Sequence, residues 1–226
     1  MSLSSEDIQA IVLSLKLATV VTSLLLVFGI PVAWWLSQSK SPWKTLIQSL
    51  LALPLVLPPT VLGFYLLLLM GPDGWLGKLF QMTGLPSLSF TFWGLVFASL
   101  IFSAPFVIQP LQNSFEAIGK RPLELAASAG ANPLDSFLTV VFPLAKPGIL
   151  TATILGFIHT IGEFGVVLMI GGSIPGETRV VSVQIYEHVE ALQYSAAHAL
   201  SLSMVIFSFA TLLVLNSLQK KRYTLF

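Results

Sequence analysis

The sequence contains no cysteine, and only 9% of its 226 residues are charged. Without cysteine the chain has no disulfide, no thiolate metal ligand and no cysteine nucleophile. Its histidines, His159, His188 and His198, lack the spacing of a metal site, so we expect no bound metal. Charged residues make up roughly 25% of a typical soluble domain. A water-soluble fold of this size could not cover its surface with so few.

Long apolar blocks take the place of the missing charge. Hydrophobic residues make up 55% of the chain, and its mean hydropathy is +0.87. A helix needs about 20 residues to cross a hydrocarbon core. Five blocks reach that length, near residues 8–36, 46–70, 91–112, 145–170 and 195–218. The sequence therefore predicts an all-α, polytopic membrane protein that forms a single domain over residues 1–226.

The positions of Lys and Arg predict the orientation of the chain, because these residues collect in cytoplasmic loops. Eight of the 11 Lys and Arg residues follow the first, third and fifth blocks. They are Lys40, Lys44, Lys120, Arg121, Lys146, Lys220, Lys221 and Arg222. An odd number of spans puts all of them on one side. We therefore expect the N-terminus outside and the C-terminus in the cytoplasm, with the chain in the inner (cytoplasmic) cell membrane.

Proline interrupts the second block, where Pro54, Pro58 and Pro59 fall within six residues. Each proline removes a helical hydrogen bond, which in lipid must be recovered from neighbouring helices or a water-lined cavity. Broken helices are common where transporters bind or gate substrate, and kinks that fit one helix against another are the alternative. We expect a helix break here, and Pro58 and Pro59 are candidates for a gate or pathway.

The connection at about residues 113–143 predicts a helix–turn–helix beside the membrane. Glu124 falls in the first turn of a predicted helix, where a carboxylate complements the helix dipole. A second helical piece is expected over Pro133–Val141. Its apolar side is made by Leu134, Phe137 and Leu138.

The same loop carries a spaced motif that resembles the "EAA" motif of ABC importer permeases. In that family Glu-Ala-Ala is followed after three residues by Gly and, nine residues later, by Ile-x-Leu-Pro. This chain departs from the pattern at Leu125, Val140 and Phe142, each an apolar replacement. Because the family's loop docks on a separate ATPase subunit, the resemblance implies a set of ATPase-coupling residues: Glu124, Ala126, Ala127, Gly130 and Pro143.

Three further segments are similar to molybdate permeases of this family, and the similarity covers essentially the whole chain. The segments are Leu53–Pro59, Gly162–Gly165 and Ile174–Arg179. Sulfate and thiosulfate permeases share the Gly-Glu-aromatic-Gly element of the second segment. The resemblance implies a type I ABC importer fold and ATP-driven alternating access that moves molybdate inward. Tungstate or sulfate/thiosulfate import, a non-ABC secondary transporter and a membrane scaffold are the alternatives.

The resemblance also implies partners. They are an ABC ATPase subunit, a periplasmic or extracellular oxyanion-binding protein, a second copy of this chain and membrane lipid, with no nucleic acid. ATP and Mg²⁺ would bind to the ATPase, so this chain is expected to be a translocation subunit without a cofactor or enzymatic activity of its own. Glu177 and Arg179 are candidates for docking the binding protein, or they pair with each other.

Glu163 is a carboxylate inside the fourth block, flanked by Gly162 and Gly165. An ionisable residue at this depth normally faces protein or a water-filled path. Because a bare carboxylate would repel an anion, we favour a gating or structural role over substrate contact. Glu163, Gly162 and Gly165 are therefore candidates for a gate or pathway. Polar residues of the third and fourth blocks that could meet an oxyanion, or simply join helices, are Ser103, Gln109, Thr151 and Thr160. Lys16 either snorkels to the outer interface or pairs with an acid such as Glu163.

Overall fold

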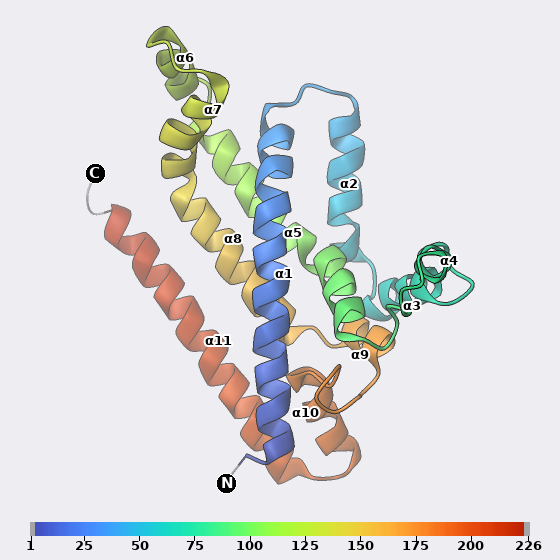
Figure 1. Cartoon of the computed structure of the whole chain (residues 1–226). Helices are drawn as coiled ribbons and strands as arrows, with labels where there is room; N and C mark the ends of the chain where they lie inside the picture. The colour runs from blue at the N-terminus through green and yellow to red at the C-terminus, as the bar shows by residue number, and fades with distance from the viewer. Residues whose placement is uncertain (1–2, 224–226) are drawn as a thin grey trace.

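The computed structural model describes the backbone of residues 3–223 and the side chains of residues 3–217. That part of the chain is helical and has no strand (Figure 1). Five helical segments are long and apolar enough to cross a membrane. They are Ser5–Gln38, Pro59–Met82, Phe92–Ile118, Pro133–Gly162 and Tyr194–Ser217. The predicted all-α architecture with five spans is confirmed.

The core consists of three long helices, α1 (Ser5–Gln38), α5 (Phe92–Ile118) and α8 (Phe142–Gly162), which pack on one another (Figure 1). Small residues allow the close approach of α8 to α5. A Cβ atom at Gly148 would lie 2.2 Å from Cβ of Ser114, and one at Gly156 would lie 2.4 Å from Cγ2 of Val107. Glycine at these contacts lets the two backbones meet, as is common between membrane helices.

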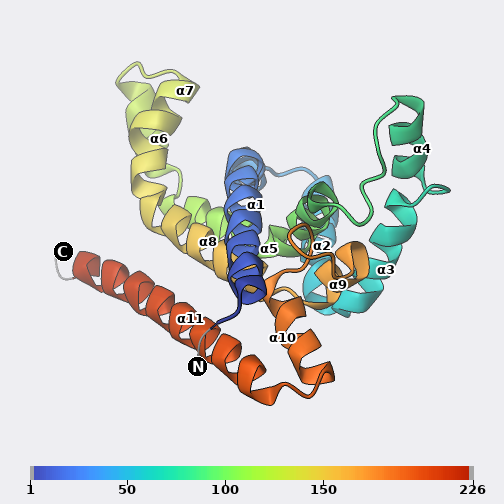
Figure 2. The same cartoon turned by 60° about the horizontal axis from the view of Figure 1, so that its bottom comes forward.

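The second apolar block is two helices, α2 (Trp43–Val56) and α3 (Pro59–Met70), instead of one continuous span over 46–70. The chain is extended at Leu57 and Pro58, with ψ of 137° and 134°, so the predicted break at the prolines is confirmed. Twelve residues of α3 rise only about 18 Å. The chain then turns at Gly71–Gly74 into α4 (Trp75–Met82), and both helices lie to one side of the core (Figure 2).

The fourth block, expected over 145–170, begins earlier and is also broken. Helix α7 (Pro133–Ser136), the π-helical turn η1 (Phe137–Val141) and α8 follow one another without a gap. Helix α8 ends at Gly162 because Glu163 adopts an extended conformation, with φ −61° and ψ 133°. A short helix, α9 (Gly165–Gly171), follows. Since α5 also continues to Ile118, the connection between the third and fourth spans is shorter than the predicted 113–143.

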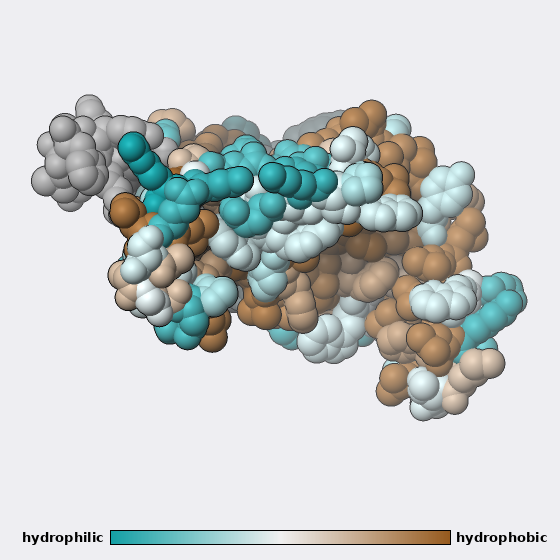
Figure 3. Space-filling view, turned by 90° about the horizontal axis from the view of Figure 1, so that it is seen from above, coloured by the Kyte–Doolittle hydropathy of each residue, from teal (hydrophilic) through white to brown (hydrophobic). Residues whose placement is uncertain are grey.

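Several connections lie at two opposite ends of the molecule. The α1–α2 connection, α6 (Arg121–Ser128) and α7 share one end, whereas the start of α1 and α10 (Val181–Glu190) lie at the other (Figure 1). Seen from the α6–α7 end, hydrophilic residues form a patch beside hydrophobic surface (Figure 3). Helix α11 (Tyr194–Tyr223) closes the chain, and the side chains of Lys220, Lys221 and Arg222 lie outside the described residues.

Candidate functional site

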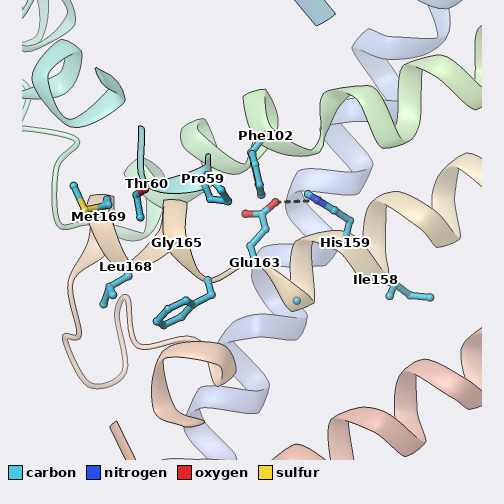
Figure 4. A pocket seen from close by; sticks show the side chains of 11 residues that line it. Pro59, Thr60, Phe102, Ile158, His159, Glu163, Gly165, Leu168 and Met169 are labelled. Carbon is cyan, nitrogen blue, oxygen red and sulfur yellow. Dashed lines mark ion pairs between the residues drawn. The ribbon is translucent and has the colours of Figure 1, made fainter. Parts of the chain in front are cut away.

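The two helix breaks meet in space and enclose a pocket of about 590 Å³ (Figure 4). A Cβ atom added to Gly165 would lie 2.9 Å from Cβ of Pro59, so α9 and α3 start in contact. Of the predicted gate residues, the structure brings four to this pocket: Pro59, Gly162, Glu163 and Gly165. Pro58 caps α3 next to them but is not part of the pocket wall. The remaining wall residues are Thr60, Phe102, Ile158, His159, Phe164, Leu168 and Met169.

The carboxylate of Glu163 is fully buried, and two serines of α5 satisfy it. Ser99 Oγ donates a hydrogen bond to Glu163 Oε2 at 2.6 Å. Ser103 Oγ donates to the other oxygen, Oε1. The side chain is 0% exposed, so it is no bare charge facing a pathway. Hydrogen bonds from side-chain hydroxyls on another helix, and not from backbone freed by the flanking glycines, compensate the cost of burying it.

His159 lies one helical turn before Glu163, with Nδ1 at 3.5 Å from Glu163 Oε1 and at 2.9 Å from Ser103 Oγ. Its ring stacks on Phe106 with 3.6 Å between centroids, and Phe102 flanks it at 5.0 Å. The imidazole side chain is 20% exposed. Figure 4 shows it beside Glu163 on the pocket wall. Aromatic packing therefore fixes the plane of a polar ring that faces the pocket.

Hydrogen bonds also fix the backbone at the end of α8, where the helix breaks at Glu163. Ser182 Oγ of α10 donates a hydrogen bond to the carbonyl oxygen of Glu163, which α8 no longer uses. Thr160 Oγ1 donates to the Gly156 carbonyl and lies 2.9 Å from Ser103 Oγ. The break is consequently tied to α5 through side chains and to α10 through its carbonyl group.

Sequence reasoning found part of this cluster and missed part. Ser103 and Thr160 are two of the four polar residues that the sequence offers for an oxyanion. Of the other two, Thr151 donates to the Pro147 carbonyl of its own helix, and Gln109 does not line the pocket. Ser99 and His159 were not considered for this cluster. The available signal was spacing, since Ser99 and Ser103 are four residues apart, as are His159 and Glu163, and such pairs share a helix face.

The motif residues of the loop lie on the projecting end of the molecule. Glu124, Ala127 and Gly130 are exposed, and Ala126 and Pro143 are half-buried. Gly130 follows α6 with φ +87°, its N–H bonds to the Ala127 carbonyl, and the Ala131 N–H bonds to the Ala126 carbonyl. These two bonds form a Schellman C-cap, in which glycine best tolerates the left-handed backbone. The glycine of the motif thus ends the helix.

An aromatic cluster connects the loop to the core. Phe137 of η1 lies 5.4 Å from Trp34 of α1 and 6.2 Å from Phe115 of α5, centroid to centroid. Leu134 and Leu138 are exposed, so the expectation that Phe137 shares their side is wrong. The π-helical turn η1 directs this ring towards the core, so the loop contacts two spans through Phe137.

At the opposite end, Glu177 and Arg179 do not pair with each other. Arg179 pairs with Glu6 at 3.3 Å and with Glu187 at 3.1 Å. Helix α10 begins two residues after Arg179, at Val181. These pairs fasten α10 to the start of α1, and Glu177 is exposed.

Two more polar contacts lie towards this end. His188 Nε2 of α10 lies 2.8 Å from Oδ1 of Asp7, which is buried. Lys16 Nζ lies 4.4 Å from the ring centroid of Phe92, so it makes a cation–π contact instead of pairing with Glu163. Among the side chains of residues 3–217, no group of three or more His, Asp and Glu is placed to hold a metal ion.

The family model "Binding-protein-dependent transport system inner membrane component" matches residues 11–221. The chain is 61% identical over 217 residues to the molybdenum transport system permease protein ModB of Azotobacter vinelandii, covering 96% of each chain. It is 33% identical over 193 residues to the sulfate transport system permease protein CysT of Synechococcus elongatus, covering 85% of this chain and 69% of the relative.

The fold is also similar to that of a solved transporter. A chain in the crystal structure of a bacterial alginate ABC transporter, in complex with its alginate-bound periplasmic protein, superposes with a TM-score of 0.78. The match covers 96% of this chain and 80% of that chain, at 17% identity. At so low an identity the match concerns the fold.

Proposed function

The chain belongs to the family of inner-membrane components of binding-protein-dependent transport systems, and we propose that it is the permease subunit of an ABC importer for molybdate. The observation that supports molybdate as the substrate is 61% identity to a molybdenum permease over 96% of both chains. The helix breaks around a pocket and the projecting motif loop support the transport role.

The proposed orientation places the α6–α7 end in the cytoplasm and the N-terminus outside. Lys40 and Lys120 lie in connections at the α6–α7 end, and Lys44 and Arg121 lie in the first turns of α2 and α6 beside them. This agrees with the accumulation of positive charge on the cytoplasmic side. The ATPase subunit, which binds ATP and Mg²⁺, docks there on exposed apolar and motif residues. This chain needs no cofactor of its own.

Two further partners complete the proposed machine. A second copy of the chain packs beside the first, and the anion moves between the two. An oxyanion-binding protein docks at the α10 end, where Glu177 is exposed and available, while Arg179 is already paired with Glu6 and Glu187. Lipid covers apolar faces such as that of α11, where Val205, Ile206 and Phe209 are exposed.

The geometry supports alternating access through the aromatic cluster. ATPase closure would pull α6 and α7, and Phe137 would pass this movement to α1 and α5 through Trp34 and Phe115. Helix α5 also carries Ser99 and Ser103, which hold the break at Glu163. The same helix thus connects the docking end with the pocket.

Uptake by a reconstituted complex tests the function. The permease, its ATPase and its binding protein are placed in proteoliposomes, and molybdenum accumulated in the presence of ATP is measured with competing tungstate or sulfate. We expect ATP-dependent molybdate uptake that tungstate reduces more than sulfate does. Accumulation of sulfate without molybdate would favour the alternative suggested by the sulfate relative.

Replacing the exposed carboxylate of Glu124 tests the docking end. Glu124→Ala should lower transport per ATP hydrolysed, because the side chain makes no hydrogen bond or ion pair to any described residue and is free to contact the ATPase. Asp135→Ala, another exposed acid of the same loop at a position that the motif does not specify, serves as the control. Equal transport-to-hydrolysis ratios in the two variants and the wild type would refute the docking assignment.

A further inference from the structure

The pocket between the helix breaks has a single side chain that can carry positive charge. Of the residues lining the pocket, only His159 and Glu163 are ionisable, and the carboxylate of Glu163 is bonded to serines behind the wall. An oxyanion in the pocket needs hydrogen-bond donors that a hydrocarbon wall does not supply. His159 is therefore the residue of the pocket wall best suited to meet an oxyanion.

The hydrogen bonds on one side of the ring fix its protonation at Nδ1. The single proton of Ser103 goes to Glu163 Oε1, so Ser103 Oγ acts as an acceptor towards Nδ1 at 2.9 Å. The other group near Nδ1 is the carboxylate itself, at 3.5 Å, which also only accepts. Nδ1 must then carry a hydrogen in either the neutral or the charged ring.

The other ring nitrogen is free to act on a ligand. Nε2 makes no hydrogen bond to any described residue, and the partly exposed ring forms part of the pocket wall. Stacking on Phe106 at 3.6 Å keeps the ring from turning. With Nδ1 protonated, Nε2 is an acceptor in the neutral ring and a donor in the imidazolium, and only a donor suits an oxyanion.

A positively charged ring at His159 would have a counter-charge beside it, because Glu163 Oε1 lies 3.5 Å from Nδ1. No other cationic side chain lines the pocket beside Glu163, and a buried carboxylate is stabilised by a counter-charge. Aromatic faces at 3.6 and 5.0 Å favour a cation as well.

We propose that His159, positioned by Glu163, Ser103 and Phe106, acts as an imidazolium that donates its Nε2–H to the tetrahedral oxyanion as it passes through the pocket. His159 is then a substrate-contacting residue, and Glu163 is a positioning residue that acts through it. The assignment rests on the proposed function. It also removes the objection to a carboxylate in an anion pathway, because the pair has no net charge and presents a donor.

Two substitutions with opposite consequences test the proposal in proteoliposomes containing the complete complex. His159→Phe keeps a flat ring against Phe106 but has no donor, whereas His159→Arg keeps a cationic donor but not the ring shape. Substrate contact predicts that His159→Phe loses molybdate uptake by about tenfold or more, the scale of one charge-assisted hydrogen bond. His159→Arg should retain most of the uptake. His198→Phe, at an exposed histidine of α11, is the matched control and should transport like the wild type.

A structural role for His159 predicts the reverse order, with uptake retained in His159→Phe and lost in His159→Arg. That result overturns the proposal, and so does equal loss in both variants when both complexes melt at the wild-type temperature. Positioning by Glu163 predicts that Glu163→Gln lowers uptake in the wild-type background but not in His159→Arg. Failure of the wild-type complex to accumulate molybdate would instead reject the proposed substrate, before any variant is compared.

Discussion

The projecting loop and the pocket between the helix breaks differ in how far their side chains are satisfied within the chain. Helix α6 of the loop buries none of its residues, and Leu125 and Leu134 are 70% and 65% exposed. In the pocket, Glu163 is fully buried and bonded to Ser99 and Ser103. The loop therefore offers unsatisfied surface to another molecule, whereas the pocket satisfies most of its polar groups internally. A substitution should disturb partner contact in the first region and both fold and function in the second.

The strongest test of this contrast removes one carboxylate from each region. Glu163→Ala leaves the buried hydroxyls of Ser99 and Ser103 without their acceptor. We therefore expect a loss of about 3–5 kcal/mol in the free energy of unfolding, because each buried donor left unsatisfied costs about 1–3 kcal/mol. Glu124→Ala, at an exposed position, should change it by no more than about 0.5 kcal/mol. Thermal unfolding in detergent measures both. Equal shifts in melting temperature would break the contrast.

A second pair of substitutions divides the loop itself into a part anchored in the core and a part available to a partner. Phe137→Ala removes a half-buried ring that contacts Trp34 and Phe115, and should cost about 2 kcal/mol of stability, below the range for a fully buried ring. Leu134→Ala should leave stability unchanged but weaken co-purification with the ATPase. A Phe137→Ala permease that melts like the wild type would contradict the proposed mechanical connection.

The contrast also explains how much of the molecule could be predicted from its sequence. Span number, the proline break and the loop motif depend on local signals: long apolar blocks, missing N–H groups and fixed spacing. The predicted span number and proline break were confirmed, because a membrane leaves the backbone few alternatives to helix. Residue roles in the loop and pocket stay predictions.

The sequence could not give the contacts that depend on how helices turn relative to one another. The π-helical turn at η1 rotates Phe137 away from Leu134 and Leu138. Ser99 and Ser103 lie about 60 residues before Glu163, and only the packing of α5 on α8 makes them neighbours. Arg179 likewise pairs with Glu6 from the far end of the chain.

The glycine of the loop motif gives a smaller effect that sharpens the same contrast. Gly130 has φ +87°, and a Cβ atom there would meet nothing within 4 Å, so only backbone strain opposes substitution. Gly130→Ala should cost about 1–2 kcal/mol locally, and Gly130→Asn less, because asparagine tolerates the left-handed region better. Transport per ATP hydrolysed should therefore fall more in Gly130→Ala than in Gly130→Asn. If Gly130→Asn lost as much transport per ATP hydrolysed as Gly130→Ala, the glycine would act by contacting the ATPase and not through its backbone conformation.

The smallest expected effect concerns a third region, the α10 end, where the titratable side chain of His188 contacts the buried carboxylate of Asp7. The hydrogen bond from His188 to buried Asp7 raises the pKa of His188 above its ordinary value of 6.5, and the charge of Glu187 acts in the same direction. Gln184 and Gln193 are the other polar groups at the ring. A raised folded-state pKa gives stability that is fully present below the unfolded value and is lost as pH rises through the folded value. The melting temperature of the wild type should therefore exceed that of His188→Gln at pH about 6, and the difference should shrink by pH about 8.5. A constant difference across this range would mean that the pair is held by neutral hydrogen bonding, like the serines around Glu163, and that charge adds nothing at this end.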